Sequence, residues 1–327
     1  MSSLPKNLHH EPELSIVVPV FNEESCLEHL YQRLLAVMTT HGIDFEIILV
    51  DDGSSDRSLE VIRTLANQDD RVRFASFSRN FGHEAASSCG FGMVRGRAAV
   101  LIDADLQDPP EVIIEMLKKW KNGFQVVYGR RSHREGESWF KKTTSSLFYK
   151  IIGIFSDVPI PADTGDFRLV DRVVVHHFNR LPEKNRFVRG MFAWLGFRQS
   201  PVDYVRPPRF KGTTKYNPLK LVQLSLDALL GFSTAPLRIA TVFGLIITVV
   251  SFLAALAVIA HRLFFDLNIP GYTLLTAGIF LLSGIQLLFI GVLGEYIGKI
   301  YHQVQGRPLY IVQETGDASS KPHDIPK

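Results

Sequence analysis

The chain begins with a repeating pattern of short apolar runs and longer segments of helical spacing. The apolar runs are rich in Val, Ile and Phe, as is typical of β-strands, and they fall within residues 14–20, 45–56, 72–78, 98–105 and 124–131. Between them, apolar residues recur every three or four positions in segments 23–38, 58–67 and 109–120, which favours amphipathic helices. Strands that alternate with helices pair in parallel and are buried on both faces. The pattern therefore predicts an α/β layer structure with ligand sites at the carboxyl ends of the strands.

Two long apolar segments lie near the end of the chain. Residues 239–260 contain no charged side chain, and residues 272–294 contain one strongly polar side chain, Gln286. At about 1.5 Å per residue, helices of this length span the roughly 30 Å hydrocarbon layer of a membrane. Buried helices of a soluble core are the alternative, but such helices usually carry a polar stripe. We therefore predict two transmembrane helices within residues 236–298, at about 237–262 and 270–296.

The segments around these spans predict how the chain meets the membrane. The connector 261–271 is short, so the spans form a hairpin, and most nearby Lys and Arg residues lie outside it. By the positive-inside rule, the chain is a multi-pass protein of the inner (plasma) membrane with both termini in the cytoplasm. Residues 217–235 have leucines at helical spacing and predict an amphipathic helix on the membrane surface, with a soluble core helix as the alternative. We expect residues 1–12 to be flexible and residues 299–327 to form a cytoplasmic tail.

Composition narrows the classes of function. The formal net charge is +3, and no basic stripe with interleaved aromatic residues is present, which argues against a nucleic-acid-binding protein. Cys26 and Cys89 are the only cysteines and do not make a disulfide framework. The polar N-terminus lacks the apolar core of a signal peptide. These features favour a soluble domain that faces a reducing compartment and is attached to a membrane.

Three predicted strands end in acidic clusters, which supply the first candidate chemistry. The clusters follow the first, second and fourth strands and read VFNEE, VDDGSSD and DADLQD. Any one of them could be a helix cap, as we expect of Asp108, which precedes a Pro-Pro pair. Three such clusters at one edge of a sheet predict a single site. Asp103 and Asp105, two residues apart, suit a hard cation such as Mg²⁺ or Mn²⁺ that also binds phosphate oxygens.

Five ordered motifs resemble those of glycosyltransferase family 2, and within it the polyprenyl-phosphate glycosyltransferases; they read VVPVFNEE, LVDDGSSD, SRNFGHEAA, DADLQDPPE and DTGDFRLVDR. The likeness of the soluble part covers residues 12–217. The two C-terminal spans are similar to those of the bacterial undecaprenyl-phosphate glucosyltransferases. The resemblance implies a Rossmann-like GT-A fold for a catalytic domain at 13–216, inverting transfer from a nucleotide sugar, a divalent ion, and a homo-oligomer, which in relatives is a tetramer.

The resemblance also assigns residues to the donor side of the site. The nucleotide-sugar ligands that it implies are Pro19, Phe21, Glu23, Asp52, Asp103 and Lys215. The metal ligands that it implies are Asp103, Asp105 and Gln107. Lys215 belongs to a basic, glycine-containing loop at 209–218 that resembles a lid over the donor diphosphate.

On the acceptor side, segment 129–155 is basic and aromatic, which suits a segment that lies on lipid headgroups and binds a lipid phosphate. A solvated helix face is the alternative. The acceptor-phosphate residues that the resemblance implies are Arg130, Arg131, Lys142 and Ser146; Lys142 stands where some relatives have arginine. Asp166 lies where the family places an acid near the acceptor, with a structural turn residue as the alternative. The implied catalytic set is Asp166, Asp105 and Arg131, and Asp166 could act as a base or orient the acceptor.

Together these features predict transfer of a hexose, expected to be glucose from UDP-glucose, to a membrane polyprenyl phosphate such as undecaprenyl phosphate. The alternatives are the same reaction with GDP-mannose, UDP-GlcNAc or an aminoarabinose donor, and a non-catalytic nucleotide-sugar-binding membrane scaffold. A processive polysaccharide synthase is disfavoured because no Gln-x-x-Arg-Trp motif is present. His83-Glu84 lacks the second His of a zinc helix, and Gly90-Phe91-Gly92 lacks the spacing of a dinucleotide fingerprint, so neither is assigned a function.

Overall fold

The structure is a computed structural model. It describes residues 11–131, 164–184, 186–207 and 271–316, together with 237, 240–247, 249–250, 252–253 and 257. The sequence predictions that lie outside these residues concern Lys142, Ser146, Lys215 with its loop, the amphipathic helix at 217–235 and much of the first membrane span. The chain divides into two units, one of Met1–Tyr149, Val158–Tyr216 and Pro308–Lys327, and the other of Lys150–Asp157 and Asn217–Arg307.

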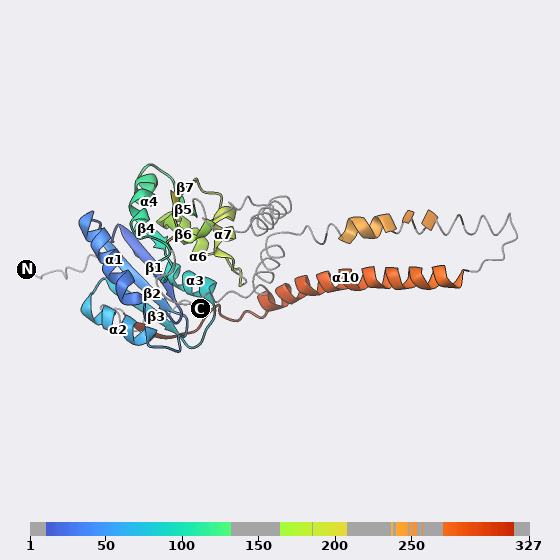
Figure 1. Ribbon diagram of the computed structural model, residues 1–327, viewed down its shortest axis with the longest axis horizontal. Coiled ribbons are helices and arrows are strands. Elements are labelled where there is room, and N and C mark those ends of the chain that lie inside the picture. Colours follow the sequence, from blue (N-terminus) through green and yellow to red (C-terminus); the bar gives the residue numbers. More distant parts are fainter. Residues whose placement is uncertain are drawn as a thin grey trace, which may run out of the picture. The chain divides into compact units, whose positions relative to one another are not determined.

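An eight-stranded sheet forms the centre of the first unit, in the order β7-β5-β6-β4-β1-β2-β3-β8 (Figure 1). The strands are β1 (Leu14–Val20), β2 (Phe45–Asp51), β3 (Val72–Phe77), β4 (Ala98–Leu101), β5 (Val126–Arg131), β6 (Thr164–Asp171), β7 (Gln199–Tyr204) and β8 (Val312–Gly316). β1 pairs in parallel with β2 and β4, β2 with β3, and β5 with β7. β6 and β8 run antiparallel to their neighbours. The predicted parallel α/β arrangement is confirmed for β1 to β4.

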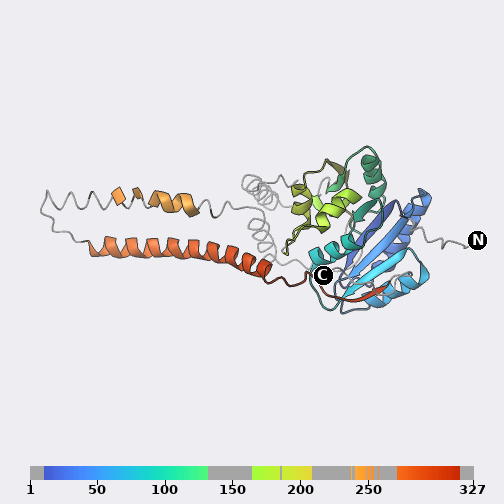
Figure 2. The same cartoon turned by 180° about the vertical axis from the view of Figure 1, so that it is seen from behind.

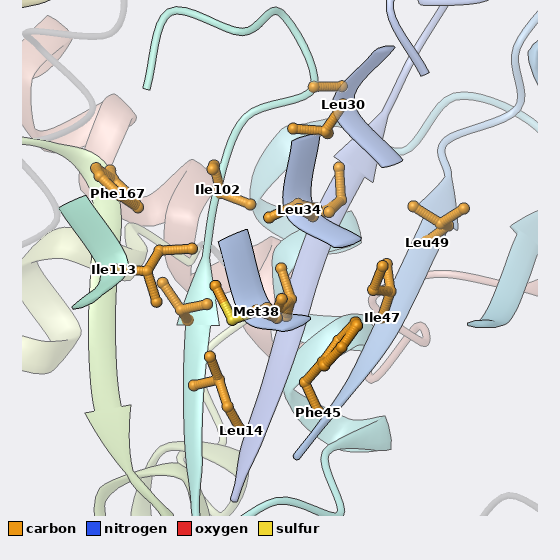
Figure 3. Packing of buried hydrophobic residues seen from close by; sticks show 14 of the residues in the cluster. Leu14, Leu30, Leu34, Met38, Phe45, Ile47, Leu49, Ile102, Ile113 and Phe167 are labelled. Carbon is orange, nitrogen blue, oxygen red and sulfur yellow. The ribbon is translucent and has the colours of Figure 1, made fainter. Parts of the chain in front are cut away.

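Helices cover both faces of this sheet (Figures 1 and 2). They are α1 (Leu27–Thr40), α2 (Ser58–Gln68), α3 (His83–Met93), α4 (Val112–Lys121), α6 (Arg172–Asn179) and α7 (Val188–Trp194). α1, α2 and α4 share one apolar core with alternate strand residues. Figure 3 shows part of it, where Leu34 and Met38 of α1 lie near Leu14 and Ile47. α3, α6 and α7 contact one another on the opposite face.

α3 is a helix that the hydrophobic pattern does not predict. Its residues from Ala85 to Phe91 are all buried, so it has no polar face and no amphipathic period. A Cβ at Gly90 would lie 2.2 Å from Cγ1 of Val17, so only glycine lets α3 pack this closely on β1. The Gly90-Phe91-Gly92 sequence therefore serves helix packing. This close contact also fixes the N-terminus of α3, which carries His83, relative to the sheet.

The segment after the last helix takes part in the sheet, although the sequence led us to expect a cytoplasmic tail at 299–327. β8 pairs antiparallel with β3, and Arg63 of α2 donates to both carboxylate oxygens of Glu314, at 3.0 and 2.5 Å. Tyr310 stacks on Phe77, with ring centroids 4.8 Å apart. The prediction of a tail is corrected for residues 310–316, because an aromatic side chain and a strand-forming segment satisfy an otherwise open sheet edge.

The second unit contains α10 (Tyr272–Val304), a helix of 33 residues. Within it, Leu282–Val304 has a mean hydropathy of 1.2 over its most apolar window, and none of that window is buried. By length and composition, it is the one helix among the described residues that could cross a membrane. α10 matches the second predicted span. The first predicted span lies largely outside the described residues, so the two-helix hairpin stays a prediction.

Candidate active site

The predicted acidic residues converge on one edge of the sheet, at the carboxyl ends of β1, β2 and β4. β6 runs antiparallel to β4, with Leu101 opposite Arg168. This register brings the start of β6, which carries Asp166, alongside the residues that follow β4. Residues from distant parts of the sequence therefore share the edge where open α/β sheets bind their ligands.

The loop after β1 is bonded to the loop after β2. Oδ1 of Asn22 accepts from the backbone N–H of Ser55 at 2.8 Å. The backbone N–H groups of Asn22 and Glu23 donate to the hydroxyls of Ser54 and Ser58, at 3.0 and 2.9 Å. Asn22 has a φ of 55°, a left-handed conformation that Asn adopts more readily than most residues. The structure thus brings together the two loops that carry the predicted nucleoside motifs.

The predicted nucleoside residues of the first motif are held at different depths. Pro19 lies inside β1, opposite Val50 of β2, and it is buried. Phe21 follows at the strand exit, and 37% of it is exposed. The carbonyl of Glu23 accepts from the backbone N–H of Cys26 at 2.9 Å and so begins the turn into α1. Of these residues, Phe21 offers the most apolar surface for a base.

The adjacent carboxylates of Asp51 and Asp52 are buried and bonded within the protein. Asp51 accepts from the hydroxyl of Ser76 at 2.7 Å. Asp52 accepts from the backbone N–H groups of Phe81 and Gly82, at 2.6 and 2.9 Å. Burial raises the pKa of Asp52, and the two backbone N–H groups partly oppose that rise. Asp52 therefore supports the loop that leads into α3, and its direct contact with a nucleoside stays a prediction.

The loop after β4 is held in an unfavourable backbone conformation. Leu106 has a φ of 60°, which is costly for a residue with a branched side chain, and it is packed into the core with 7% exposed. Oδ1 of Asp105 accepts from the backbone N–H of Gln107 at 3.1 Å. Nε2 of Gln107 donates to the carbonyl of Pro207 at 3.4 Å. These contacts hold the Asp-x-Asp motif in a fixed turn, whereas the role of Gln107 as an ion ligand stays a prediction.

Asp103 and Asp105 have the chemistry of a partial site for a hard cation. Burial raises the pKa of Asp103, His83 opposes that rise, and the carboxylates of Asp166 and Asp105 raise it further. A bound cation would relieve this repulsion. Within the ranges that the structure describes, no three His, Cys, Asp or Glu side chains are grouped to hold a metal ion. Mg²⁺ is often bound by only one or two carboxylates, and water and substrate phosphates supply its other ligands. Asp103 and Asp105 suit Mg²⁺ or Mn²⁺ bound in this way.

Asp166 and His83 form an ionic chain with Arg189 beside the metal motif. Nε and Nη2 of Arg189 donate to the two oxygens of Asp166, at 2.6 and 2.8 Å. Nε2 of His83 lies 3.6 Å from Oδ2 of Asp166 and 3.8 Å from Oδ1 of Asp103. Burial alone would raise the pKa of Asp166, but Arg189 and His83 hold it well below its usual range. Burial would lower the pKa of His83, but Asp166 and Asp103 raise it to about 10.

These shifts bear on what Asp166 can do. A carboxylate with a strongly depressed pKa and a bidentate arginine partner is a weak proton acceptor. It is suited to orient a neighbouring cation or substrate by charge. The two-point contact with Arg189 is compatible with the orienting role, and the role of Asp166 stays a prediction.

Two further charged residues, the partly buried Glu84 and the buried Arg168, lie next to this chain. Oε2 of Glu84 accepts from the backbone N–H of Val188 at 3.1 Å, and burial raises the pKa of Glu84 to about 7. Nε and Nη2 of Arg168 donate to the carbonyls of Asp166 and Gly165, at 3.2 and 2.9 Å. Burial lowers the pKa of Arg168 to about 10. The bond of Glu84 thereby ties α3 to α7, and the bonds of Arg168 hold the start of β6, which carries Asp166.

The two arginines predicted to bind the acceptor phosphate lie on opposite faces of β5, because successive strand residues alternate. Arg130 is about half exposed, and its Nε and Nη2 donate to the oxygens of Asp203 at 2.6 and 2.9 Å. Arg131 lies opposite Tyr204 of β7. The structure thus separates the pair: Arg130 is engaged at the surface, and Arg131 points to the face that carries Tyr204.

Asp108 does not cap the following helix, contrary to the sequence expectation. The N-cap position of α4 is Glu111, whose side chain makes no capping hydrogen bond. Asp108 is fully buried, and its Oδ1 accepts from the hydroxyl of Tyr204 at 2.5 Å. Burial, together with the charge of Asp103, raises the pKa of Asp108 to about 6. A tertiary contact from β7 has replaced the local one.

Sequence reasoning missed His83, Arg189 and Tyr204 as site residues. His83 lies inside the motif SRNFGHEAA, and its position at the start of a helix beside the strand ends was the available signal. Arg189 and Tyr204 lie in segments without a recognisable pattern. The packing of α7 brings Arg189 to this edge, and the pairing of β5 with β7 brings Tyr204 there.

Comparison with known proteins places the chain in a family. Residues 15–178 match the model of glycosyl transferase family 2. The chain is 48% identical to the uncharacterized glycosyltransferase YkcC of Bacillus subtilis, over 94% of this chain and 96% of the relative. It is 41% identical to the bactoprenol glucosyl transferase of Shigella phage SfII, over 93% of this chain and 98% of the relative. A solved mannosyl-3-phosphoglycerate synthase from Rubrobacter xylanophilus is 17% identical and covers 80% of this chain and 79% of its own, with a TM-score of 0.49.

The family match and the strand order agree with each other. The match begins in β1 and ends in α6, so it includes the acidic loops after β1, β2 and β4 and also Asp166. The resemblance drawn from the five motifs is confirmed, and the sheet with its helices is the GT-A fold that the resemblance implied. The chain belongs to glycosyl transferase family 2 and is a glycosyltransferase.

Proposed function

We propose that the enzyme transfers glucose from UDP-glucose to the phosphate of a membrane polyprenyl phosphate, in the simplest case undecaprenyl phosphate. The observation that carries the proposal is 41% identity, along almost the whole of both chains, to a protein named for glucosyl transfer to bactoprenol. Bactoprenol is a polyprenyl lipid, so the name of this relative gives both the sugar, glucose, and the class of acceptor. The five motifs and the clustered acidic residues support the same reaction.

On the donor side, the bonded loops after β1 and β2 offer a surface for the nucleoside, with Phe21 exposed beside it. The diphosphate must approach Asp103 and Asp105, which repel it unless a cation lies between them. Asp103 and Asp105, with Gln107 as the predicted third ligand, would hold Mg²⁺ or Mn²⁺. When bound, the ion would neutralise the charge that develops on the departing UDP. Lys215 is the predicted lid contact to the same diphosphate.

On the acceptor side, an oxygen of the lipid phosphate attacks the anomeric carbon as the bond to UDP breaks, with inversion at that carbon. The attacking oxygen is already anionic at neutral pH, so a strong general base is not required. The fixed anion Asp166, held by Arg189, supports an orienting role. Arg131 is the proposed phosphate ligand, with Arg130, Lys142 and Ser146 as the other predicted contacts. Positioning and electrostatics then supply most of the acceleration.

A lipid acceptor requires a site that a membrane can reach. The candidate span in α10 supports attachment of the enzyme to a bilayer. We extend this to a multi-pass protein of the inner membrane, with the catalytic domain and both termini in the cytoplasm. A homo-oligomer, a tetramer by family resemblance, belongs to the same proposal.

The test is a transfer assay with the full-length protein in nanodiscs. Radiolabelled UDP-glucose, UDP-GlcNAc and GDP-mannose are each supplied with undecaprenyl phosphate and Mg²⁺ or Mn²⁺. We expect labelled lipid from UDP-glucose, its loss on chelation by EDTA, and a β-linked product by nuclear magnetic resonance. Labelling from GDP-mannose alone would replace the proposed donor. No labelled lipid from any donor would contradict the proposed reaction.

A further inference from the structure

The loop between β3 and α3, residues 78–82, contacts the turn after β2 that carries a predicted nucleoside motif. Asp52 of this turn accepts from two backbone N–H groups of the loop, at 2.6 and 2.9 Å. A Cβ at Gly53 would lie 2.7 Å from the backbone nitrogen of Asn80, so only glycine lets the two segments approach this closely. A shift of the β3–α3 loop would therefore displace the turn after β2 as well.

The β3–α3 loop is also held by residues that follow α10 in the sequence. The backbone N–H of Ser78 donates to the carbonyl of Ile311 at 3.0 Å. The ring of Tyr310 lies 4.8 Å from the ring of Phe77, and the two planes are only 10° apart. Phe77 is buried and meets Phe81 edge to face, with ring centroids 5.8 Å apart. A series of aromatic contacts therefore runs from the C-terminal segment through the end of β3 into the loop.

The hydroxyl of Tyr310 fixes the position of this ring. It forms a hydrogen bond with the thiol of Cys89 in α3, the helix that begins where the loop ends. Burial raises the pKa of Cys89 to about 12, so the thiol stays protonated at neutral pH and is not a nucleophile. Further along the C-terminal segment, Arg63 donates to both oxygens of Glu314. Contacts with β3, α3 and α2 thus keep Tyr310 against the loop.

We propose that Tyr310 is a positioning residue for the nucleotide of the donor, because it holds the β3–α3 loop, through Phe77, against the turn that carries Asp52. The proposal rests on the proposed function, since it names a support of the same donor site. A loop that is held in place before the nucleotide arrives loses less entropy on binding, and a smaller competent fraction weakens the apparent affinity in proportion. Tyr310 lies outside residues 15–178, which match the family model, and after the candidate membrane helix in the sequence. A residue encoded beyond that helix thus supports donor binding.

The test uses full-length variants in nanodiscs and measures UDP binding by calorimetry with Mg²⁺, together with backbone hydrogen exchange of residues 78–82. Tyr310→Leu removes the ring and should weaken UDP binding about threefold to tenfold and speed exchange in the loop. The KM for UDP-glucose should rise by about the same factor, with kcat within about twofold of wild type. Tyr310→Phe keeps the stacked ring and loses only the hydroxyl, so its UDP affinity should stay within about twofold of wild type.

Tyr31 of α1 offers a matched control. Like Tyr310 it is partly buried, and its hydroxyl is bonded, here to Asp69 at 2.8 Å. It packs against the apolar core that α1 shares with α2 and α4, on the face of the sheet opposite α3. Tyr31→Leu should lower the thermal midpoint about as much as Tyr310→Leu, with UDP affinity and loop exchange as in wild type. A purely structural role for Tyr310 would lower the midpoint in both variants and leave UDP affinity unchanged in both.

Three results would overturn this role of Tyr310. They are unchanged UDP affinity in Tyr310→Leu, unchanged exchange of residues 78–82 in that variant, or an equal loss of UDP affinity in Tyr31→Leu. If Tyr310→Leu does not fold, Tyr310→His, which keeps a smaller ring, decides by the same two measurements. If the wild type binds UDP but makes no glycolipid, the proposed function fails. Weaker UDP binding by Tyr310→Leu than by Tyr31→Leu then still retains the positioning role, and equal binding removes it.

Discussion

At the carboxyl ends of the strands, the carboxylates beside β2 and those beside β4 and β6 have different kinds of partner. Beside β2, Asp51 and Asp52 accept from hydroxyl and backbone N–H groups, which are neutral donors within the protein. Beside β4 and β6, Asp103 and Asp166 face the cations of His83 and Arg189. Neutral donors fix a shape, whereas paired charges respond when another charge arrives. The β2 side holds the loop that leads into α3, and we propose that the β4–β6 side receives the ion and the phosphates.

The largest expected effect comes from removing a charge on the β4–β6 side. Asp105→Ala takes away one of two carboxylates available to a divalent ion, so transfer should fall by at least about 10²–10³-fold. Membrane insertion should be unchanged, because Asp105 lies in the first unit, away from α10 in the sequence. Labelled lipid formation and the membrane fraction of the protein are measured together. Wild-type turnover by this variant would remove the metal assignment.

Breaking the arginine–aspartate pair should have the next largest effect. Arg189→Gln leaves Asp166 without the donors at 2.6 and 2.8 Å, so kcat should fall about tenfold to a hundredfold with the KM for UDP-glucose little changed. Arg189→Lys retains the charge but not the two-point contact and should be intermediate. A double-mutant cycle with Asp166→Asn measures the coupling. Additive losses in that cycle would mean that the two residues act separately.

Because the carboxylates beside β2 bond to groups within the protein, we expect their removal to reduce the stability of the fold. Asp52→Ala removes the acceptor for Phe81 and Gly82 and should lower the free energy of unfolding by about 1–3 kcal/mol. Asp52→Asn keeps an acceptor oxygen and should lose less. Thermal unfolding in detergent and UDP binding by calorimetry are compared. If Asp52→Ala weakens UDP binding at unchanged stability, Asp52 contacts the nucleoside directly and the contrast fails on this side.

The smallest expected effect is a pH dependence at the bonded loops. Oδ2 of Asp56 accepts from the backbone N–H of Glu24 at 3.2 Å, and Oδ1 accepts from that of Ser58 at 2.9 Å. Burial would raise the pKa of Asp56, but Ser58 and Glu24 hold it below its ordinary value of 3.8. Since the folded pKa is the lower one, the stabilisation is complete above pH 3.8 and is lost as the pH falls through the folded pKa.

Comparison with Asp56→Asn isolates this contribution. Wild type should exceed the variant in thermal midpoint at about pH 5, and the two midpoints should converge toward about pH 3. A constant difference across this range would show that the carboxylate charge does not stabilise the loops.

Elements could be predicted from the sequence where the pattern of apolar residues within one segment decides the structure. β1 and β2 are continuous apolar runs buried on both faces; β1 has the predicted bounds, and β2 begins at the predicted residue 45 but ends at Asp51, before the predicted 56. The acidic residues at their exits could be assigned to one edge because parallel strands end together. The same rules fail for α3, because its small and apolar residues pack on all sides and show no period.

The rest of the site depends on contacts that no local pattern encodes. Tyr204 and Asp108 are 96 positions apart, and only the β5–β7 pairing brings the hydroxyl to the carboxylate. Asp108 next to Pro-Pro has the local pattern of a cap, yet burial and a distant donor decided its partner. His83 fitted no zinc motif, and its surroundings of carboxylates were visible only after β4 and β6 were placed side by side.

The final strand has a consequence for how the enzyme is made. β8 is synthesised after α10, yet it closes the β3 edge of a sheet whose other strands precede α10 in the chain. A ribosome-bound chain therefore exposes the backbone of β3 while α10 is still emerging, and an open edge of this kind invites pairing with other chains. We therefore expect folding of the catalytic domain to be complete only after α10 and β8 have left the ribosome. Production of the domain without residues 308–316 is accordingly expected to yield aggregates, and supplying that segment as a fused C-terminal strand should restore a soluble protein.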